Sequence, residues 1–91
     1  MTQSAKVTSE TAVMDKVIRV IADVMSVSPD LLSPGTSIRT DLGADSMQIV
    51  TVVIALDTEF DAEFNVDEIP SGDVTIEWVC KMVQSVLSRV R

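Results

Sequence analysis

Apolar residues recur at every third or fourth position in the first third of the chain, and this spacing predicts an amphipathic helix. The helix is expected to begin at Thr8 or Ser9, either of which can cap it, and to end near Met25, with one apolar face made of Val13, Val17, Val20, Ile21 and Val24. A second helix is predicted from about Asp45 to Phe60, with a stripe of Met47, Val50, Val53, Leu56 and Phe60. A closing helix is predicted from about Thr75, with an apolar face of Ile76, Val79, Val83, Val86, Leu87 and Val90.

Two connecting segments separate these helices. The first, SVSPDLLSPGTSIRTDLGA, is rich in helix-breaking and turn-forming residues, and such a long connection needs its own side chains to hold it, for which the candidates are Leu31, Leu32, Ile38 and Leu42. The second, DAEFNVDEIPSGDV, leaves room only for a short helical turn at about Val66 to Ile69. The chain is therefore predicted to be all-α, a small four-helix bundle with three main helices, a short third helix and a long first loop. Residues 1–8 are expected to form a flexible tail before one domain at 9–91.

The composition fits this architecture. Hydrophobic residues make up 46% of the 91 positions but aromatic residues only 3%, so the core must consist mainly of Val, Ile, Leu and Met. The longest apolar run, from Ile49 to Leu56, is interrupted by Thr51 and is far shorter than the roughly 20 residues of a membrane span. No secretory or transit signal is recognisable at the N-terminus, so a soluble cytoplasmic protein is expected.

The net charge of −7 is unevenly distributed. Residues 40–80 carry ten acids and no Lys or Arg, whereas residues 81–91 carry three bases, Lys81, Arg89 and Arg91, and no acid. An acidic middle segment disfavours nucleic acid and anionic membranes and favours basic patches on partner proteins. The alternative is that the acids only keep a small domain soluble.

The cysteine and histidine content of the chain limits the chemistry that it can perform. The chain has one cysteine, Cys80, and no histidine, which excludes an internal disulfide and a Cys/His zinc site. Cys80 is expected to be a small buried hydrophobic residue on a helix, with a reactive thiol as the alternative.

Ser46 is the residue whose position suggests function. A nucleophilic serine needs a base, usually histidine, and no lysine lies near it in sequence, so self-catalysis by Ser46 is not expected. A helix N-terminus favours a phosphate, and Ser46 could carry one there as an ester. Gly43 allows a tight turn before it, Leu42 can anchor the loop, and Asp45 is both a good cap and a potential metal ligand. On these grounds alone, Ser46 could equally be an ordinary first residue of a helix.

The segment DLGADSM resembles the attachment motif of acyl carrier proteins, in which a serine receives 4'-phosphopantetheine. The resemblance extends through ALDTEFDAEF and covers roughly residues 9–90. It implies that Ser46 carries the arm, that Asp45 assists the modifying transferase through a metal ion, and that Gly43, Leu42 and Met47 flank the site. It also implies a monomeric carrier without catalytic activity, which tethers acyl groups as thioesters and shelters them among its helices. The expected partners are a phosphopantetheinyl transferase and acyl-loading or acyl-transferring enzymes with basic or partly apolar patches.

Several positions depart from the family pattern. Met47 replaces the usual leucine, a swap that should be tolerated in a packed interface with the first loop. Gln48 and Thr51 replace acids that typically meet partner enzymes, and the candidate partner-binding surface becomes Gln48, Ile49, Thr51, Ile54, Asp57 and Glu59. These changes predict a dedicated partner set rather than a housekeeping role.

The segment EIPSGDV interrupts what is commonly a short acidic helix in the family. Pro70 and Gly72 could loosen the wall around the cargo or merely reshape a loop. Trp78 is expected to pack at the edge of the core, with cargo contact as the alternative. Fatty acid, specialised lipid and polyketide assembly all remain open, as do a peptidyl carrier and an acidic interaction module without an arm.

Overall fold

The computed structural model describes residues 10–90, and side-chain surroundings are described for residues 12–88. It contains three α-helices, α1 (Glu10–Met25), α2 (Ser46–Phe60) and α3 (Ile76–Val90), and two 3-10 turns, η1 (Pro29–Leu31) and η2 (Val66–Glu68). The predicted caps Thr8 and Ser9 and the predicted tail lie outside the described residues. Within the described residues the all-α prediction is confirmed, but the short third helix is a 3-10 turn and not a fourth α-helix.

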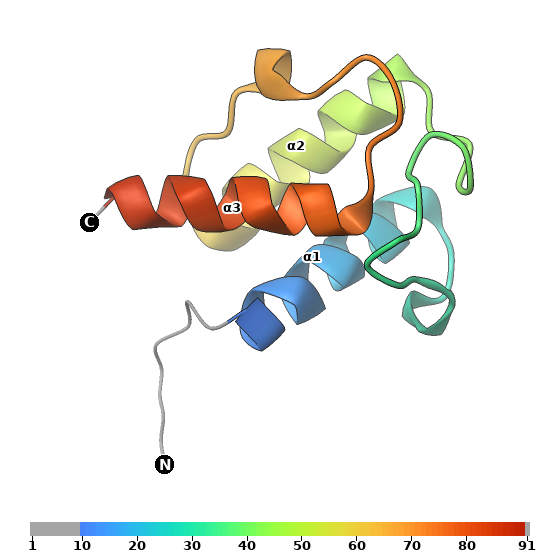
Figure 1. Ribbon diagram of the computed structural model, residues 1–91, viewed down its shortest axis with the longest axis horizontal. Coiled ribbons are helices and arrows are strands. Elements are labelled where there is room, and N and C mark those ends of the chain that lie inside the picture. Colours follow the sequence, from blue (N-terminus) through green and yellow to red (C-terminus); the bar gives the residue numbers. More distant parts are fainter. Residues whose placement is uncertain (1–9, 91) are drawn as a thin grey trace.

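Helix α1 packs against both α2 and α3. In Figure 1, α2 and α3 both run back across α1 from the side where α1 ends, and the long first connection lies on that side with the starts of α2 and α3. The core is aliphatic, as the composition predicts, and its fully buried side chains are Val13, Val17, Ile21, Ile38, Leu56, Val74, Ile76 and Val83.

The apolar stripe predicted for α2 is only partly right. Val53 and Leu56 are buried and Phe60 is half-buried, but Met47 and Val50 are exposed, and the buried face instead includes Ile49 and Val52. Almost every residue from 47 to 56 is apolar, so the periodicity does not fix which side of the helix faces inward. The packing of α2 against α1 and the rest of the core decides it.

The first connection is held down by three of the four residues expected to hold it. Leu32 and Ile38 are buried and Leu42 packs partly against the core, whereas Leu31 is 73% exposed on η1 and does not contribute. Leu31 follows Pro29 and Asp30 in a 3-10 turn that contributes no residue to the core, so its side chain is directed outward.

Hydrogen bonds join the first connection to the segment before α3. The Ile38 amide donates to the Val74 carbonyl at 2.8 Å, and Ser37 and Thr40 both donate side-chain hydrogen bonds to the carboxylate of Asp73. These two hydroxyls hold the pKa of Asp73 below its ordinary value, Ser37 having the larger effect. The contribution of this contact to stability is therefore complete above the ordinary pKa and is lost as the pH falls through the lowered one.

The closing helix matches its prediction. Thr75 precedes the helix, and its hydroxyl accepts a hydrogen bond from the Trp78 amide at 3.1 Å. Trp78 is half-buried against the core, as predicted. Ile76, Val79 and Val83 are buried and Val86 and Leu87 are partly buried, whereas the side chains of Arg89, Val90 and Arg91 lie outside the described set.

Cys80 is buried, and its thiol lies 3.3 Å from the Met14 sulfur. Burial, with a smaller contribution from the charge of Glu77, raises the pKa of the Cys80 thiol to about 11. The thiol is therefore protonated at neutral pH and is a poor nucleophile there, as expected for a structural cysteine.

Candidate functional site

Ser46 is the first residue of α2, and it is exposed. The chain reaches it through Gly43, whose φ of +74° lies in the left-handed region that favours glycine, and through the buried Ala44. Leu42 packs partly against the core just before this turn. The loop is therefore anchored on the inside, and it presents the first turn of α2 to solvent, as the sequence predicts.

Asp45 caps α2 together with Gln48. One carboxylate oxygen of Asp45 accepts a hydrogen bond from the Gln48 amide at 2.9 Å, and the Gln48 side-chain oxygen accepts one from the Asp45 amide at 3.2 Å. This reciprocal pair is a capping box. The sequence-based prediction assigns Gln48 only to the partner surface, although the Asp-x-x-Gln spacing is itself a signal for this structural role.

The start of α2 can accommodate a phosphate ester. The described residues form no hydrogen bond with the Ser46 hydroxyl, and the Gln48 and Ile49 amides are already used by Asp45. The amides of Ser46 and Met47 are the first two of the helix and have no intrahelical acceptor. These donors and the helix dipole favour negative charge next to Ser46.

Two predictions about the surface of α2 are wrong. Met47 is 72% exposed, so it does not sit in a packed interface with the first loop. Ile49 is buried among the core residues and adds nothing to the partner surface. Both errors have the same cause as the misplaced stripe, namely an apolar sequence that does not reveal which side of the helix is buried.

The other predicted partner-binding residues divide into two groups. Thr51 and Ile54 are exposed, as expected. Asp57 is half-buried, and its carboxylate accepts a hydrogen bond from the Phe64 amide at 2.9 Å, while Glu59 lies 3.7 Å from the Lys16 ammonium. Both acids therefore have partners within the domain.

An apolar void lies between α2, α3 and the two connecting segments. Its volume is about 10 Å³, which holds one water molecule at most. Its lining consists of Ile38, Ile49, Val52, Val53, Leu56, Ile69, Val74, Val79 and Met82. Ile69 and Val74, which lie on either side of the Pro70–Gly72 stretch, both contribute to this lining. Trp78 is not part of the lining.

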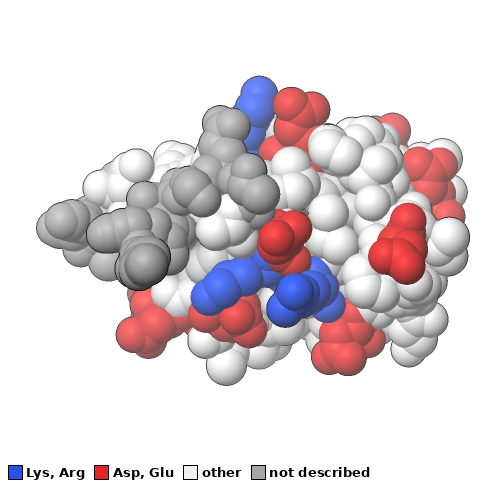
Figure 2. Space-filling model, turned by 90° about the horizontal axis from the view of Figure 1, so that it is seen from below, with Lys and Arg blue, Asp and Glu red and all other residues white. Residues whose placement is uncertain are grey.

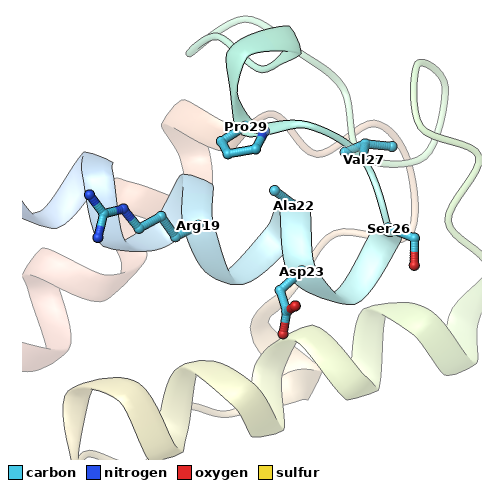
Figure 3. Close-up of a pocket in the computed structure, with 6 residues that line it drawn as sticks. All are labelled: Arg19, Ala22, Asp23, Ser26, Val27 and Pro29. Atoms are coloured by element: carbon cyan, nitrogen blue, oxygen red, sulfur yellow. The ribbon is translucent and has the colours of Figure 1, made fainter.

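A larger hollow of about 350 Å³ lies at the end of α1, away from these residues. Figure 3 shows Ala22 and Pro29 facing each other across it, while the charged ends of Arg19 and Asp23 point away in different directions. No set of polar groups converges there, so this hollow does not define a second reactive site.

The charged surface is more mixed than the sequence segments suggest. On the face shown in Figure 2, lysine and arginine side chains lie among acidic ones, next to broad uncharged areas. In the fold, α1, which carries Lys16 and Arg19, packs against α2 of the acidic middle segment. Within the part of the chain that the structure describes, no helix is long and apolar enough to cross a membrane.

A small helical domain with an exposed serine at a helix start is suited to carrying a covalently attached group. Comparison with known proteins identifies the group, because the family described as "Phosphopantetheine attachment site" matches residues 15–83. The acyl carrier protein of Campylobacter lari is 35% identical over 79 residues, which cover 82% of this chain and 96% of that protein. The mitochondrial acyl carrier protein 2 of Arabidopsis thaliana is 33% identical over 76 residues, which cover 80% of this chain and 60% of that relative's length.

The chain therefore belongs to the acyl carrier protein family. The cofactor of this family is phosphopantetheine, and its members are carriers and not enzymes. Once bound, the group supplies a thiol on which acyl chains are held as thioesters.

Proposed function

We propose that Ser46 carries the phosphopantetheine arm and that the protein uses it to deliver acyl intermediates between enzymes of fatty acid, specialised lipid or polyketide assembly. The observation that supports this most directly is the exposed Ser46 hydroxyl, which no described residue engages, at the start of α2. The glycine turn and the partly buried Leu42 hold this position in place without covering it.

Asp45 has two tasks in this proposal. One carboxylate oxygen caps α2, as the structure shows. The carboxylate still has free lone pairs, and we propose that these bind a metal ion brought by the transferase during loading. Gly43, Leu42 and Met47 contribute by positioning or flanking the serine.

Loading with coenzyme A and a broad-specificity phosphopantetheinyl transferase tests the assignment. Intact-mass measurement is expected to show one added arm on the wild-type chain and none on Ser46→Ala. Ser71→Ala, which removes an exposed serine in the connection before α3, should load like wild type. The assignment fails if wild type gains no arm or if Ser46→Ala still gains one.

The same assay separates the two tasks of Asp45. Asp45→Asn keeps an oxygen that can cap the helix but loses the charge that attracts a metal ion. It should therefore unfold at nearly the wild-type denaturant concentration yet load more slowly, most clearly at low magnesium. Loading at the wild-type rate at every magnesium concentration would remove Asp45 from the metal site.

We also propose that the protein is cytoplasmic and monomeric.

Intact-mass analysis of protein purified from its native host would identify any acyl group retained on the arm, and therefore the pathway. A peptide-bond-forming system would reveal itself by an aminoacyl group instead.

A further inference from the structure

Arg39 is a cation whose charge is not paired within the domain. It is the one lysine or arginine between Arg19 and Lys81 in the sequence. The residue is half-buried on the first connection, and within the part of the chain that the structure describes its guanidinium forms no ion pair. Asp41, two residues further on, instead accepts a hydrogen bond from the Ser37 amide at 2.8 Å.

The guanidinium of Arg39 uses only part of its hydrogen-bonding capacity. Its Nη2 donates to the Pro70 carbonyl at 3.1 Å. Its Nε is fully buried and has no hydrogen-bond partner. Nε and Nη2 lie on the same edge of a guanidinium and present two parallel N–H donors, which a carboxylate accepts together with its two oxygens. The single Pro70 oxygen therefore fills only one half of a two-oxygen site.

The Arg39–Pro70 contact lies at the rim of the apolar void between α2, α3 and the two connecting segments. The residues that directly precede Arg39 and Pro70 in the chain, Ile38 and Ile69, both line that void. All the residues of the lining are apolar, so a carboxylate that moved inside would lose its hydration without gaining a partner. The charged end of a tethered group therefore has to stay at the rim, where Arg39 lies.

A group tethered to Ser46 can reach Arg39. The Ala44 amide donates to the Ile38 carbonyl at 3.1 Å, so the chain between Arg39 and Ser46 doubles back on itself. With two residues from Ala44 to Ser46, the Arg39 and Ser46 Cα atoms are no more than about 15 Å apart. A pantetheine arm with an acyl group on its thiol can fold back over this distance. The net charge of −7 disfavours a free anion, but the tether raises the effective concentration of the cargo at the site.

We infer that Arg39 binds the free carboxylate of an acyl group carried on the arm, so that the cargo of this domain includes acyl chains with a charged end. This inference rests on the proposed function of Ser46 and narrows the class of cargo that the proposed function leaves open. On binding, the carboxylate replaces the Pro70 carbonyl and accepts from both Nε and Nη2, so that both donors are paired. An acyl chain without a carboxylate leaves the Arg39–Pro70 hydrogen bond in place.

Two acyl groups of equal carbon number test the site. A broad-specificity phosphopantetheinyl transferase charges the protein from glutaryl-coenzyme A or pentanoyl-coenzyme A, whose acyl groups differ in the terminal carboxylate. Heteronuclear NMR of nitrogen-labelled protein follows the Arg39 Nε–H signal in the unloaded, arm-only, pentanoyl and glutaryl forms. The loss of this signal in Arg39→Gln assigns it. Arg19→Gln is the matched control, because Arg19 is an exposed arginine beside the separate hollow at the end of α1.

The Arg39 Nε–H signal is expected to move in the glutaryl form and to stay in place in the other three. Carbon NMR of a labelled glutaryl group measures the pKa of its carboxyl. This pKa should be about 1 lower in wild type than in Arg39→Gln, because a bound cation favours the ionised form. Arg19→Gln should leave it at the wild-type value, and Arg39→Lys, which keeps the charge but not the paired donors, should retain only part of the effect. Thermal unfolding of each variant shows that it is folded.

Two results would overturn the inference. One is an Arg39 Nε–H signal at the same position in the pentanoyl and glutaryl forms. The other is a signal that already moves in the arm-only form, which would assign Arg39 to the phosphodiester or the amides of the arm. Should Arg39→Gln fail to fold, Arg39→Lys assigns the signal, and the wild-type forms alone decide. If wild type accepts no arm at all, the proposed function fails instead, so the two failures are distinguishable.

Discussion

The two ends of α2 use their side chains in opposite ways. Toward its C-terminus, Asp57 binds the Phe64 amide, Glu59 pairs with Lys16, and Phe60 meets Phe64 edge-on with ring centroids 6.4 Å apart. Toward its N-terminus, Met47, Val50 and Ile54 project from the domain without such contacts in the core.

This contrast reverses the simple expectation for a soluble helix. Charged residues that could have been assigned to partners are engaged within the domain, and apolar residues that could have been assigned to the core lie outside. Residue type alone therefore does not show which side chains of α2 are engaged within the domain and which are left exposed.

The largest expected effect on stability comes from a comparison of two aliphatic residues of α2, Leu56 and Ile54. Leu56 is fully buried, so Leu56→Ala should lower the free energy of unfolding by about 2–5 kcal/mol. Ile54 is 58% exposed, so Ile54→Ala should change it by about 0.5 kcal/mol or less. Urea titrations of both variants measure the difference, and similar losses would show that Ile54 packs in the core as Leu56 does.

A smaller effect is expected at Asp57. Asp57→Ala leaves the Phe64 amide without its acceptor beside a buried side chain, and should cost about 1–3 kcal/mol. Asp57→Asn retains a carbonyl oxygen at this position and should lose less. If the urea midpoints of the two variants coincide, the charge and not the hydrogen bond is what stabilises this end of the helix.

The smallest effect is expected for the ion pair at Glu59. The Lys16 and Glu59 side chains are 48% and 43% exposed, so Glu59→Gln should cost less than about 1 kcal/mol. The difference from wild type should disappear in about 1 M NaCl, where the screening length is about 3 Å. Lys16 also lies 5.8 Å from the Phe60 ring centroid, so Lys16→Gln should cost slightly more. A salt-independent cost for Glu59→Gln would contradict an electrostatic origin.

Much of this fold could be predicted from the sequence. The extents of the three helices are correct to within a residue or two wherever the structure describes them, because capping residues and turn signals mark their ends. The start of α2 at Asp45 or Ser46 and the tight turn at Gly43 also follow from local sequence. The motif around Ser46 is specific enough to indicate the family without knowledge of the fold.

The errors concern choices that local sequence does not determine. The orientation of α2 about its own axis depends on how it packs against α1 and the rest of the core, so the apolar pattern puts Met47, Val50 and Ile49 on the wrong sides. Leu31 and Leu32 are adjacent leucines, and only the 3-10 turn decides that Leu32 is the buried one. The internal partners of Asp57 and Glu59 come from Phe64 and from a distant helix, contacts that periodicity does not reveal.

The nearly filled interior between α2 and α3 has a consequence for cargo. Because a protein interior is close-packed, an alkyl chain that enters this space must displace the surrounding helices and connecting segments. Each added methylene would then increase the volume of the protein itself, an expansion that densimetry can register.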